Sequence, residues 1–549
     1  MLPPLLQVLL TNPACYDHPV AKLDLIETHI SWVLLTGLYA YKIKKPVNLG
    51  FLDFSTLALR EQDCHDELRL NRRLAADYYL DVVAITGTPD APRINGLPLP
   101  NPDVTTSHST KASKNDAQVA GYLPQAGEGA IALSPSGGKL DRGLGANESP
   151  REIDETLEYA VKMRQFPADA TLDRCAARGE LGNLQIDALA TRLAHFHLSE
   201  CERATADSPW GEPETIACPV EENFQVLARG AKADELIDLR RWCNAEHARL
   251  APLMAARKKN GFVRECHGDL HLANLAWVNE GLVIFDALEF SPALRWIDVI
   301  SEVAFCYMDL LHRKFPALAA RFLNLWLEAT GDYQGVALLR YYAVYRALVR
   351  AKVAALRAEQ GCTSSLAEMN ECLQLAQQLT FPPSSVACSL FITHGLSGSG
   401  KTTISQQRLE KYGLIRLRSD VERKRLAGLD AGARGGEALG IYSESFGLRT
   451  YQHLANLAED LLQAGWSVIV DAAFLKRRER DMFRDLAQRV GADFGILDIQ
   501  VDPEILRERV RRRSAEGRDA SDADLRVLDQ QLNIVQPLGE DEQSVTEQL

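Results

Sequence analysis

Long apolar stretches are missing from this sequence: no segment has eighteen uncharged apolar residues, so we expect no membrane-spanning helix. The apolar run in residues 1–13 has no basic region before it, which predicts a short helix rather than a signal peptide. CxxC pairs are also absent, and the 11 cysteines are scattered. This pattern argues against a zinc site or a disulfide framework and indicates reduced thiols in a cytoplasmic protein.

An excess of positive charge is lacking as well, because the formal net charge is −13. Such a balance argues against a general binder of nucleic acids or of anionic membranes. It is compatible with a cationic substrate but does not establish one. The contents of 46% hydrophobic and 25% charged residues are those of a soluble globular protein.

At 549 residues the chain is too long for one ordinary core, so we expect two or three domains. A predicted helical region, 341–380, is broken by Pro-Pro-Ser-Ser at 382–385. We therefore predict a domain over 1–380, a linker over 381–385 and a domain over 386–549. Residues 86–150 are dominated by Gly, Pro, Ser, Thr, Asn and Asp, which predicts an extended, partly disordered insertion.

One stretch, residues 267–290, carries a set of groups suited to phosphoryl transfer. Asp269 and Asn274 are five residues apart, and Asp286 follows a predicted buried strand over 282–285. Transfer from ATP needs a carboxylate that accepts the proton of a substrate hydroxyl, and oxygen ligands that hold Mg²⁺ on the phosphates. Asp269, Asn274 and Asp286 offer oxygen-bearing side chains of the kinds that this reaction needs.

The same stretch resembles the aminoglycoside phosphotransferase family, which has a kinase-like fold. The resemblance lies in His-Gly-Asp-Leu-His at 267–271 and in Asn274. It implies that Asp269 is the catalytic base, that Asn274 and Asp286 bind metal, and that ATP and Mg²⁺ are the cofactors. The segment after Asp286, Ala-Leu-Glu-Phe, has no glycine.

A lysine that contacts the ATP phosphates is expected on the second of two strands predicted within 27–44. Lys42 and Lys44 share one face of that strand, and its sequence resembles the lysine-bearing strand of kinases. We favour Lys42 and keep Lys44 as the alternative. Glu67, on a helix predicted over 57–74, is the expected partner of Lys42, with an ordinary surface glutamate as the alternative. No GxGxxG precedes the lysine, so the loop that covers the phosphates is not assigned.

Other polar residues have weaker interpretations. His197 lies near the end of an amphipathic helix predicted over 186–200, and we interpret it as a packed or capping residue rather than as a metal ligand. A predicted helix over 295–311 contains Asp298, Glu302 and Asp309. Asp298 is a candidate brace for the catalytic loop, and the acids could instead line a pocket for a cationic substrate. We slightly favour a solvated acidic face.

A second phosphate-binding motif begins after the domain boundary. An apolar strand is predicted over 386–393, and the GxxxxGK[ST] pattern follows it. The glycines let backbone N–H groups turn inward around phosphate oxygens, while the lysine reaches the terminal phosphates and the threonine hydroxyl can bind Mg²⁺. The predicted nucleotide-binding residues are Gly395, Leu396, Ser397, Gly398, Ser399, Gly400, Lys401, Thr402 and Thr403.

Further strands predicted over 414–417, 467–470 and 494–501 complete a parallel sheet. Asp420 and Asp471 follow two of them, at the edge where ligands bind. This half resembles the P-loop kinases that include zeta toxins, polynucleotide kinases and gluconate kinases. The resemblance implies that Asp420 is the base or the ligand of the substrate hydroxyl, and that Asp471 helps to hold metal or substrate. Asp471 could instead cap the following helix.

The basic segment 506–513 resembles the lid of related kinases, whose arginine stabilises the transferring phosphate. We assign that role to Arg513, with Arg509 next, and expect Arg513→Ala to slow transfer more than it weakens ATP binding. A nucleic-acid patch is the rival interpretation. Ser521 and Asp524 resemble a capping box for the last helix, and the tail after residue 537 is expected to fray.

These observations predict two fused kinase-type domains. The first is an α+β protein-kinase-like fold and the second an α/β P-loop kinase with a parallel sheet. We expect an ATP- and Mg²⁺-dependent phosphotransferase with two independent sites, acting on hydroxyl groups of small molecules. A nucleic-acid end at the C-terminal site is less favoured. The alternative is a regulatory protein in which nucleotide binding switches conformation. Each half is expected to bury its own core.

Overall fold

The computed structural model describes residues 2–48, 52–95, 155–231, 233–362, 364–381, 388–430, 433, 440–516 and 524–548. Within these ranges no helix is both long and apolar enough to cross a membrane. The predicted linker, apart from Phe381, and most of the predicted insertion lie outside them. Residues 86–95 are described and belong to a β-sheet, so this part of the predicted insertion is structured instead.

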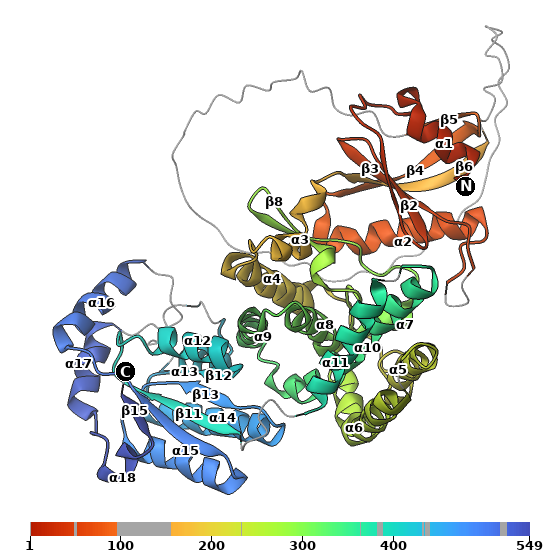
Figure 1. The fold of residues 1–549 in the computed structure, drawn as a ribbon. Coiled ribbons are helices and arrows are strands. Elements are labelled where there is room, and N and C mark those ends of the chain that lie inside the picture. The colour runs from red at the N-terminus through yellow and green to blue at the C-terminus, as the bar shows by residue number, and fades with distance from the viewer. Residues whose placement is uncertain are drawn as a thin grey trace, which may run out of the picture.

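An antiparallel sheet of six strands forms the N-terminal layer, in the order β1-β2-β3-β6-β4-β5 (Figure 1). Its strands are β1 Asp24–Glu27, β2 Ser31–Leu35, β3 Tyr39–Lys44, β4 Tyr79–Thr88, β5 Ala91–Asn95 and β6 Thr156–Arg164. Helix α1 (Pro4–Thr11) is the predicted short N-terminal helix. Helix α2 (Leu57–Ala75) packs on β4 and β6, and it begins at Thr56, whose hydroxyl accepts from the Leu59 N–H.

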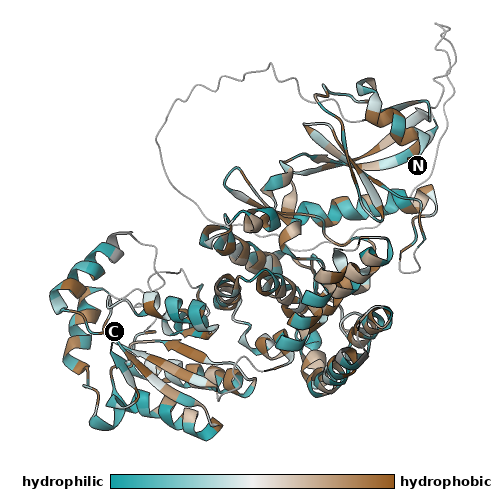
Figure 2. Cartoon of the chain, in the orientation of Figure 1, coloured by the Kyte–Doolittle hydropathy of each residue, from teal (hydrophilic) through white to brown (hydrophobic). Residues whose placement is uncertain are grey.

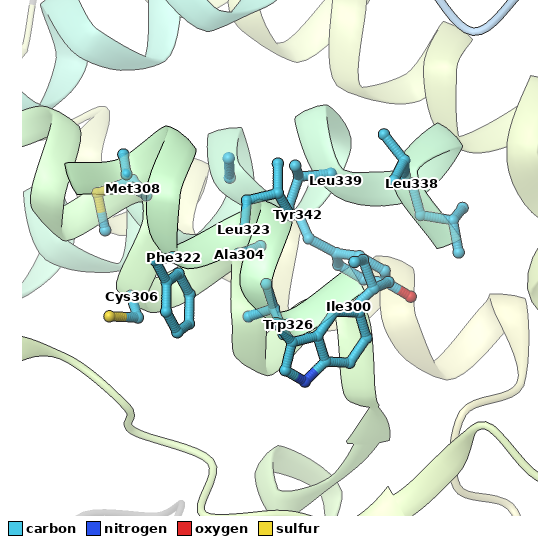
Figure 3. Close-up of a cluster of buried hydrophobic side chains, with 14 of the residues drawn as sticks. Ile300, Ala304, Cys306, Met308, Phe322, Leu323, Trp326, Leu338, Leu339 and Tyr342 are labelled. Carbon is cyan, nitrogen blue, oxygen red and sulfur yellow. The ribbon is translucent and has the colours of Figure 1, made fainter. Parts of the chain in front are cut away.

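A helical lobe follows. Its helices are α3 Leu172–Ala177, α4 Asn183–His195, α5 Pro213–Leu227, α6 Ala233–Lys259, α7 Pro292–Arg295, α8 Val299–His312, α9 Pro316–Thr330, α10 Val336–Glu359 and α11 Ser365–Thr380. Two small sheets pair β7 Val263–Glu265 with β10 Trp296–Asp298, and β8 Leu275–Val278 with β9 Gly281–Ile284. Trp326 and Phe322 of α9 lie in a core shared with α8 and α10 (Figure 3).

The C-terminal sheet has five parallel strands in the order β12-β13-β11-β14-β15. They are β11 Ser389–His394, β12 Ile415–Arg418, β13 Val468–Asp471, β14 Asp493–Asp498 and β15 Thr546–Gln548. The helices are α12 Lys401–Tyr412, α13 Ser419–Leu426, α14 Glu444–Gln463, α15 Arg477–Val490, α16 Pro503–Glu516, α17 Leu525–Ile534 and α18 Glu540–Gln543. Hydrophobic residues gather on the strands, and the outer helices α15 and α16 are mostly hydrophilic (Figure 2). Both predicted fold classes are confirmed.

The end of the chain differs from the prediction of a frayed tail. Strand β15 pairs in parallel with β14, and Glu542 of α18 accepts two hydrogen bonds from the buried Arg480. The charge pair and the added strand hold this segment against the sheet. Asp524 is itself the N-cap of α17, because its side chain accepts from the Val527 N–H, while Ser521 lies outside the described residues.

The two halves share a hydrophobic contact, contrary to the expectation of separate cores. Helix α9 of the helical lobe packs against β12, the edge strand of the parallel sheet, and against α12. Ala320 of α9 lies in one buried cluster with Leu409, Leu414 and Ile469. An edge strand exposes unpaired backbone groups, so covering it with a helix protects both surfaces from water. The halves therefore form a continuous packed structure.

Candidate functional sites

Lys42 of β3 lies where three segments distant in sequence meet. Its Nζ is 2.9 Å from Glu67 Oε1 and 2.6 Å from Asp286 Oδ1. Burial opposes the charge of Lys42, but the two carboxylates outweigh it and raise its pKa well above the usual value. The expected pair with Glu67 is present, and Lys42 is the strand lysine that contacts the predicted metal ligand Asp286.

Lys44 lies in a different environment from Lys42. Its Nζ is 2.8 Å from Asp63 Oδ2 and 2.5 Å from Glu67 Oε2, and it also contacts Glu289. The three carboxylates are close enough to share a metal ion, but the Lys44 ammonium lies among them. Burial, with the neighbouring charge of Glu67, raises the pKa of Glu289 to about 7 despite Lys44. This cluster holds α2 against β3.

A Glu289→Gln variant should lose part of the pH dependence of unfolding. Folding raises the pKa of Glu289, so protonation of this carboxyl stabilises the folded state. The stabilisation is fully present below the ordinary pKa and is lost as pH rises through about 7. Calorimetric unfolding between pH 5 and 8 should show a steeper fall in transition temperature for the wild type than for the variant. The exposed Glu280→Gln serves as control, and parallel curves for all three proteins would contradict this assignment.

The catalytic loop brings Asp269 and Asn274 into contact. Asn274 Nδ2 donates to the backbone oxygen and to Oδ2 of Asp269, both at 3.0 Å. His271 Nε2 is 3.4 Å from Asp269 Oδ2. Burial opposes ionisation of Asp269, but His271 outweighs it and lowers the pKa of this carboxyl. Asp269 is therefore an ionised acceptor at neutral pH, while the Asn274 amide oxygen can face a metal.

Two buried acids of α8 hold this loop. Glu302 Oε1 accepts from the N–H groups of His267 and Gly268 at 2.6 and 2.8 Å, and Asp309 Oδ2 accepts from the Leu272 N–H at 2.9 Å. The solvated acidic face that we favoured is therefore wrong. The sequence signal was present, because these acids are two helical turns apart among apolar neighbours.

Asp298, the predicted brace of the loop, serves elsewhere. Its Oδ1 caps α8 by accepting from the Ile300 N–H at 3.0 Å, and Arg257 donates to both of its oxygens at 2.7 and 2.8 Å. Its carboxylate oxygens are thus engaged by the start of α8 and by Arg257. The loop braces are Glu302 and Asp309.

His197 is a packed histidine, as the preferred interpretation had it. Trp326 Nε1 donates to its Nδ1 at 3.1 Å, so its Nε2 donates to Glu302 Oε2 at 2.7 Å. Both ring nitrogens are thereby satisfied in a buried position. The histidine orients the carboxylate that binds the catalytic loop.

Asp286 has an unusual backbone conformation for a predicted metal ligand. Its φ is 62°, in the left-handed region that non-glycine residues rarely adopt. Its N–H donates to the Tyr79 hydroxyl at 3.1 Å, and the next N–H, of Ala287, donates to Asn71 Oδ1 at 2.8 Å. These contacts stabilise the strained turn and aim the carboxylate at Lys42. Sequence reasoning missed Tyr79 and Asn71, which are more than 200 residues from Asp286 and Ala287.

The second motif forms the turn between β11 and α12. Gly398 and Gly400 have φ of 84° and 102°, and a Cβ on Gly395 would lie 2.9 Å from the Ile499 carbonyl oxygen. Glycine is therefore required for the shape of this loop. Lys401 Nζ donates to the carbonyls of Gly395 and Leu396 at 3.0 and 2.8 Å.

The groups around this turn fit a Mg²⁺–nucleotide. The Ser399 hydroxyl is buried without a hydrogen-bond partner among the described residues, as expected for a donor meant for phosphate. Thr402 Oγ1 donates to Asp471 Oδ2 at 2.8 Å, which pairs a hydroxyl and a carboxylate suited to Mg²⁺. Arg418 Nε lies 3.8 Å from the same carboxylate oxygen.

Known proteins resemble this chain over part of its C-terminal half and over most of its length. Residues 390–538 match the family model AAA_33, described as an AAA domain. The C-terminal half is a P-loop domain, and the N-terminal half has a protein-kinase-like fold. An uncharacterized protein of Mycobacterium tuberculosis is 27% identical over 516 residues, covering 92% of this chain and 90% of its own. A protein of Mycobacterium bovis matches to the same extent.

Some solved structures resemble parts of this chain at low sequence identity. A choline/ethanolamine kinase family protein from Mesorhizobium loti covers 66% of this chain and 88% of its own, with 9% identity and a TM-score of 0.36. A gluconokinase from Sinorhizobium meliloti covers 30% of this chain and 82% of its own, with 20% identity and a TM-score of 0.22.

A cavity of about 1000 Å³ opens on the P-loop. Asp420 and Asp471 line it, and Arg423 Nη1 is 3.1 Å from Asp420 Oδ1. The side chain of Arg513 lies outside the described residues. Arg509, the second choice for the lid arginine, lines the cavity together with Arg512.

Proposed function

We propose that the protein is an ATP- and Mg²⁺-dependent phosphotransferase with two sites, each of which transfers the γ-phosphate to a hydroxyl group. The observation that carries this proposal is the meeting of Lys42, Glu67 and Asp286 beside the Asp269–Asn274 pair. Binding alone requires no base, so the ionised Asp269 favours an enzyme over a nucleotide-binding regulator.

In the N-terminal site each side chain has one task. Lys42, held by Glu67, neutralises phosphate charge, while Asn274 and Asp286 supply the oxygen ligands of Mg²⁺. Asp269 accepts the proton of the acceptor hydroxyl as the oxygen–phosphorus bond forms and ADP leaves. In the P-loop site, Lys401 would contact the phosphates and Thr402 would bind the metal. Asp420 lines the cavity in which the acceptor would bind.

The P-loop cavity further suggests an acceptor that carries a phosphate or carboxylate group. Lys476 and Arg478 line the cavity, and both pair at 2.9 Å with Glu444, whose side chain is 70% exposed. Arg423, which lies over the Tyr442 ring at 5.2 Å, also lines the cavity. An anionic acceptor would displace the exposed Glu444 and take both cations. A nucleic-acid end remains the less favoured form of this acceptor.

Lys476→Gln and Arg478→Gln should each raise the KM for such an acceptor about tenfold or more, because a hydrogen bond to a charged group contributes roughly 1.5–3 kcal/mol. The KM for ATP should change little. Steady-state kinetics with varied acceptor and with varied ATP give the two KM values separately. Arg489→Gln, on the same helix but paired with Glu459 outside the cavity lining, is the matched control. A rise in the KM for ATP alone would contradict the acceptor assignment.

The function is tested by a phosphate-transfer screen on the full chain. Pooled hydroxyl metabolites, aminoglycosides and oligonucleotides are offered with labelled ATP. Asp269→Asn and Lys401→Ala then assign each product to one site. Absence of any phosphorylated product, with both nucleotides bound, would favour the regulatory alternative.

A further inference from the structure

Glu328, a residue of the kinase-like half, binds two arginines of the P-loop domain. It lies near the end of α9 and is 7% exposed. Its Oε1 accepts from Arg416 Nε at 2.7 Å, and its Oε2 is 3.6 Å from Arg418 Nη1. Arg416 and Arg418 are two residues apart on β12, so both project toward the same side of the sheet.

Both arginines also approach the groups that fit Mg²⁺. Arg416 Nη1 donates to the backbone oxygen of Thr402 and to Ser405 Oγ, both at 3.4 Å. Arg418 lies between Glu328 and Asp471, at 3.6 and 3.8 Å from their carboxylate oxygens. Glu328 and Asp471 therefore share one guanidinium group, which offers Nη1 to Glu328 and Nε to Asp471.

The position of Glu328 is fixed by hydrogen bonds between the two halves. Asn324, one turn earlier on α9, donates to the Leu414 carbonyl at 2.9 Å and accepts from the Arg416 N–H at 2.6 Å. Arg425 donates to the backbone oxygen of Glu328 itself at 2.6 Å. Helix α9 is thus tied to the backbone of β12 and cannot slide along it without breaking buried hydrogen bonds.

We propose that Glu328 is a positioning residue for the metal site of the P-loop domain, supplied by the other half of the chain. By binding Arg418 it draws that positive charge away from Asp471, and so leaves the Asp471 carboxylate available to Mg²⁺. Partners of metal ligands commonly tune affinity in this way. The inference rests on the proposed Mg²⁺–nucleotide binding at this site, and not on the transfer reaction.

Glu328→Gln is expected to lower the Mg²⁺ affinity of the nucleotide-loaded P-loop site about ten- to a hundredfold. Glutamine keeps the size of the side chain but removes the charge that holds Arg418. Mg²⁺ is titrated by calorimetry into the full chain with bound ATP, in an Asp286→Ala background that weakens the N-terminal metal site. Nucleotide binding in EDTA should be unchanged. Adding Arg418→Gln should restore most of the lost affinity, since it removes the competing cation.

Arg321→Gln is the matched control. Arg321 lies on the same helix and pairs across the same interface with Glu410 at 2.8 Å, near the far end of α12. It should leave the Mg²⁺ affinity unchanged while removing an interface ion pair.

Two results would overturn the proposal: wild-type Mg²⁺ affinity in Glu328→Gln, or failure of Arg418→Gln to restore it. Should Glu328→Gln not fold, Arg418→Gln alone is expected to bind Mg²⁺ more tightly than the wild type, and unchanged affinity would refute the role. Absence of any phosphorylated acceptor refutes the proposed function but leaves the Mg²⁺ titration unaffected, so the two failures are distinguishable.

Discussion

Asp269→Asn should lower phosphoryl transfer at the N-terminal site by about a hundred- to ten-thousandfold, the usual loss for a positioned base. Asparagine cannot take the proton of the acceptor hydroxyl. Nucleotide binding should stay nearly intact, because Lys42, Asn274 and Asp286 hold the phosphates and the metal. Rates are measured with an acceptor of the N-terminal site, and nucleotide binding by calorimetry.

The variant carries its own internal control, since products of the P-loop site should form at the wild-type rate. Asp238→Asn, an exposed position on α6, controls for a change of charge at the surface. Full activity of Asp269→Asn would remove this residue from the mechanism. Equal losses at both sites would instead indicate damage to the shared fold.

Lys401→Ala should remove one of two bound nucleotides. Lys401 is the cation of the P-loop, and its Nζ lies against the carbonyls of Gly395 and Leu396, at the point where terminal phosphates are expected. Calorimetric titration of the full chain with ATP and Mg²⁺ should give a stoichiometry of two for the wild type and one for the variant. Asp286→Ala should weaken the remaining site in a Mg²⁺-dependent manner.

Lys411→Ala, at the exposed end of the same helix, is the matched control and should retain both nucleotides. A wild-type stoichiometry of one that disappears in Lys401→Ala would mean that the N-terminal half binds no nucleotide. The proposal of two phosphotransferase sites would then be abandoned.

The packed contact between the halves changes how such experiments should be done. If each half buried its own core, as we expected from the sequence, a cut in the predicted linker would release two soluble domains. In the structure, such a separation would expose Ala320 of one half and Leu414 of the other. It would also break the buried ion pair between Glu328 and Arg416. An unpaired buried charge is strongly destabilising. Variants of the full chain are therefore the appropriate material.

What the sequence determined by itself was local chemistry. Asp269 and Asn274 sit on one loop, Asp286 at the end of one strand, and the P-loop glycines in one turn, so their geometry follows from short-range backbone conformation. Element positions followed from apolar patterning and breakers, which is why α2, the helical region that holds α10 and α11, and the central parallel strands were predicted.

Tertiary structure decided every pairing between distant segments. Lys42 and Lys44 share a strand face, and packing alone places the first beside Asp286 and the second among Asp63, Glu67 and Glu289. The same holds for Glu302 under the catalytic loop and for Glu328 across the domain interface, 88 residues from Arg416. A buried carboxylate and a solvated one look alike in a sequence, because their difference lies in which neighbours folding brings within a few ångströms.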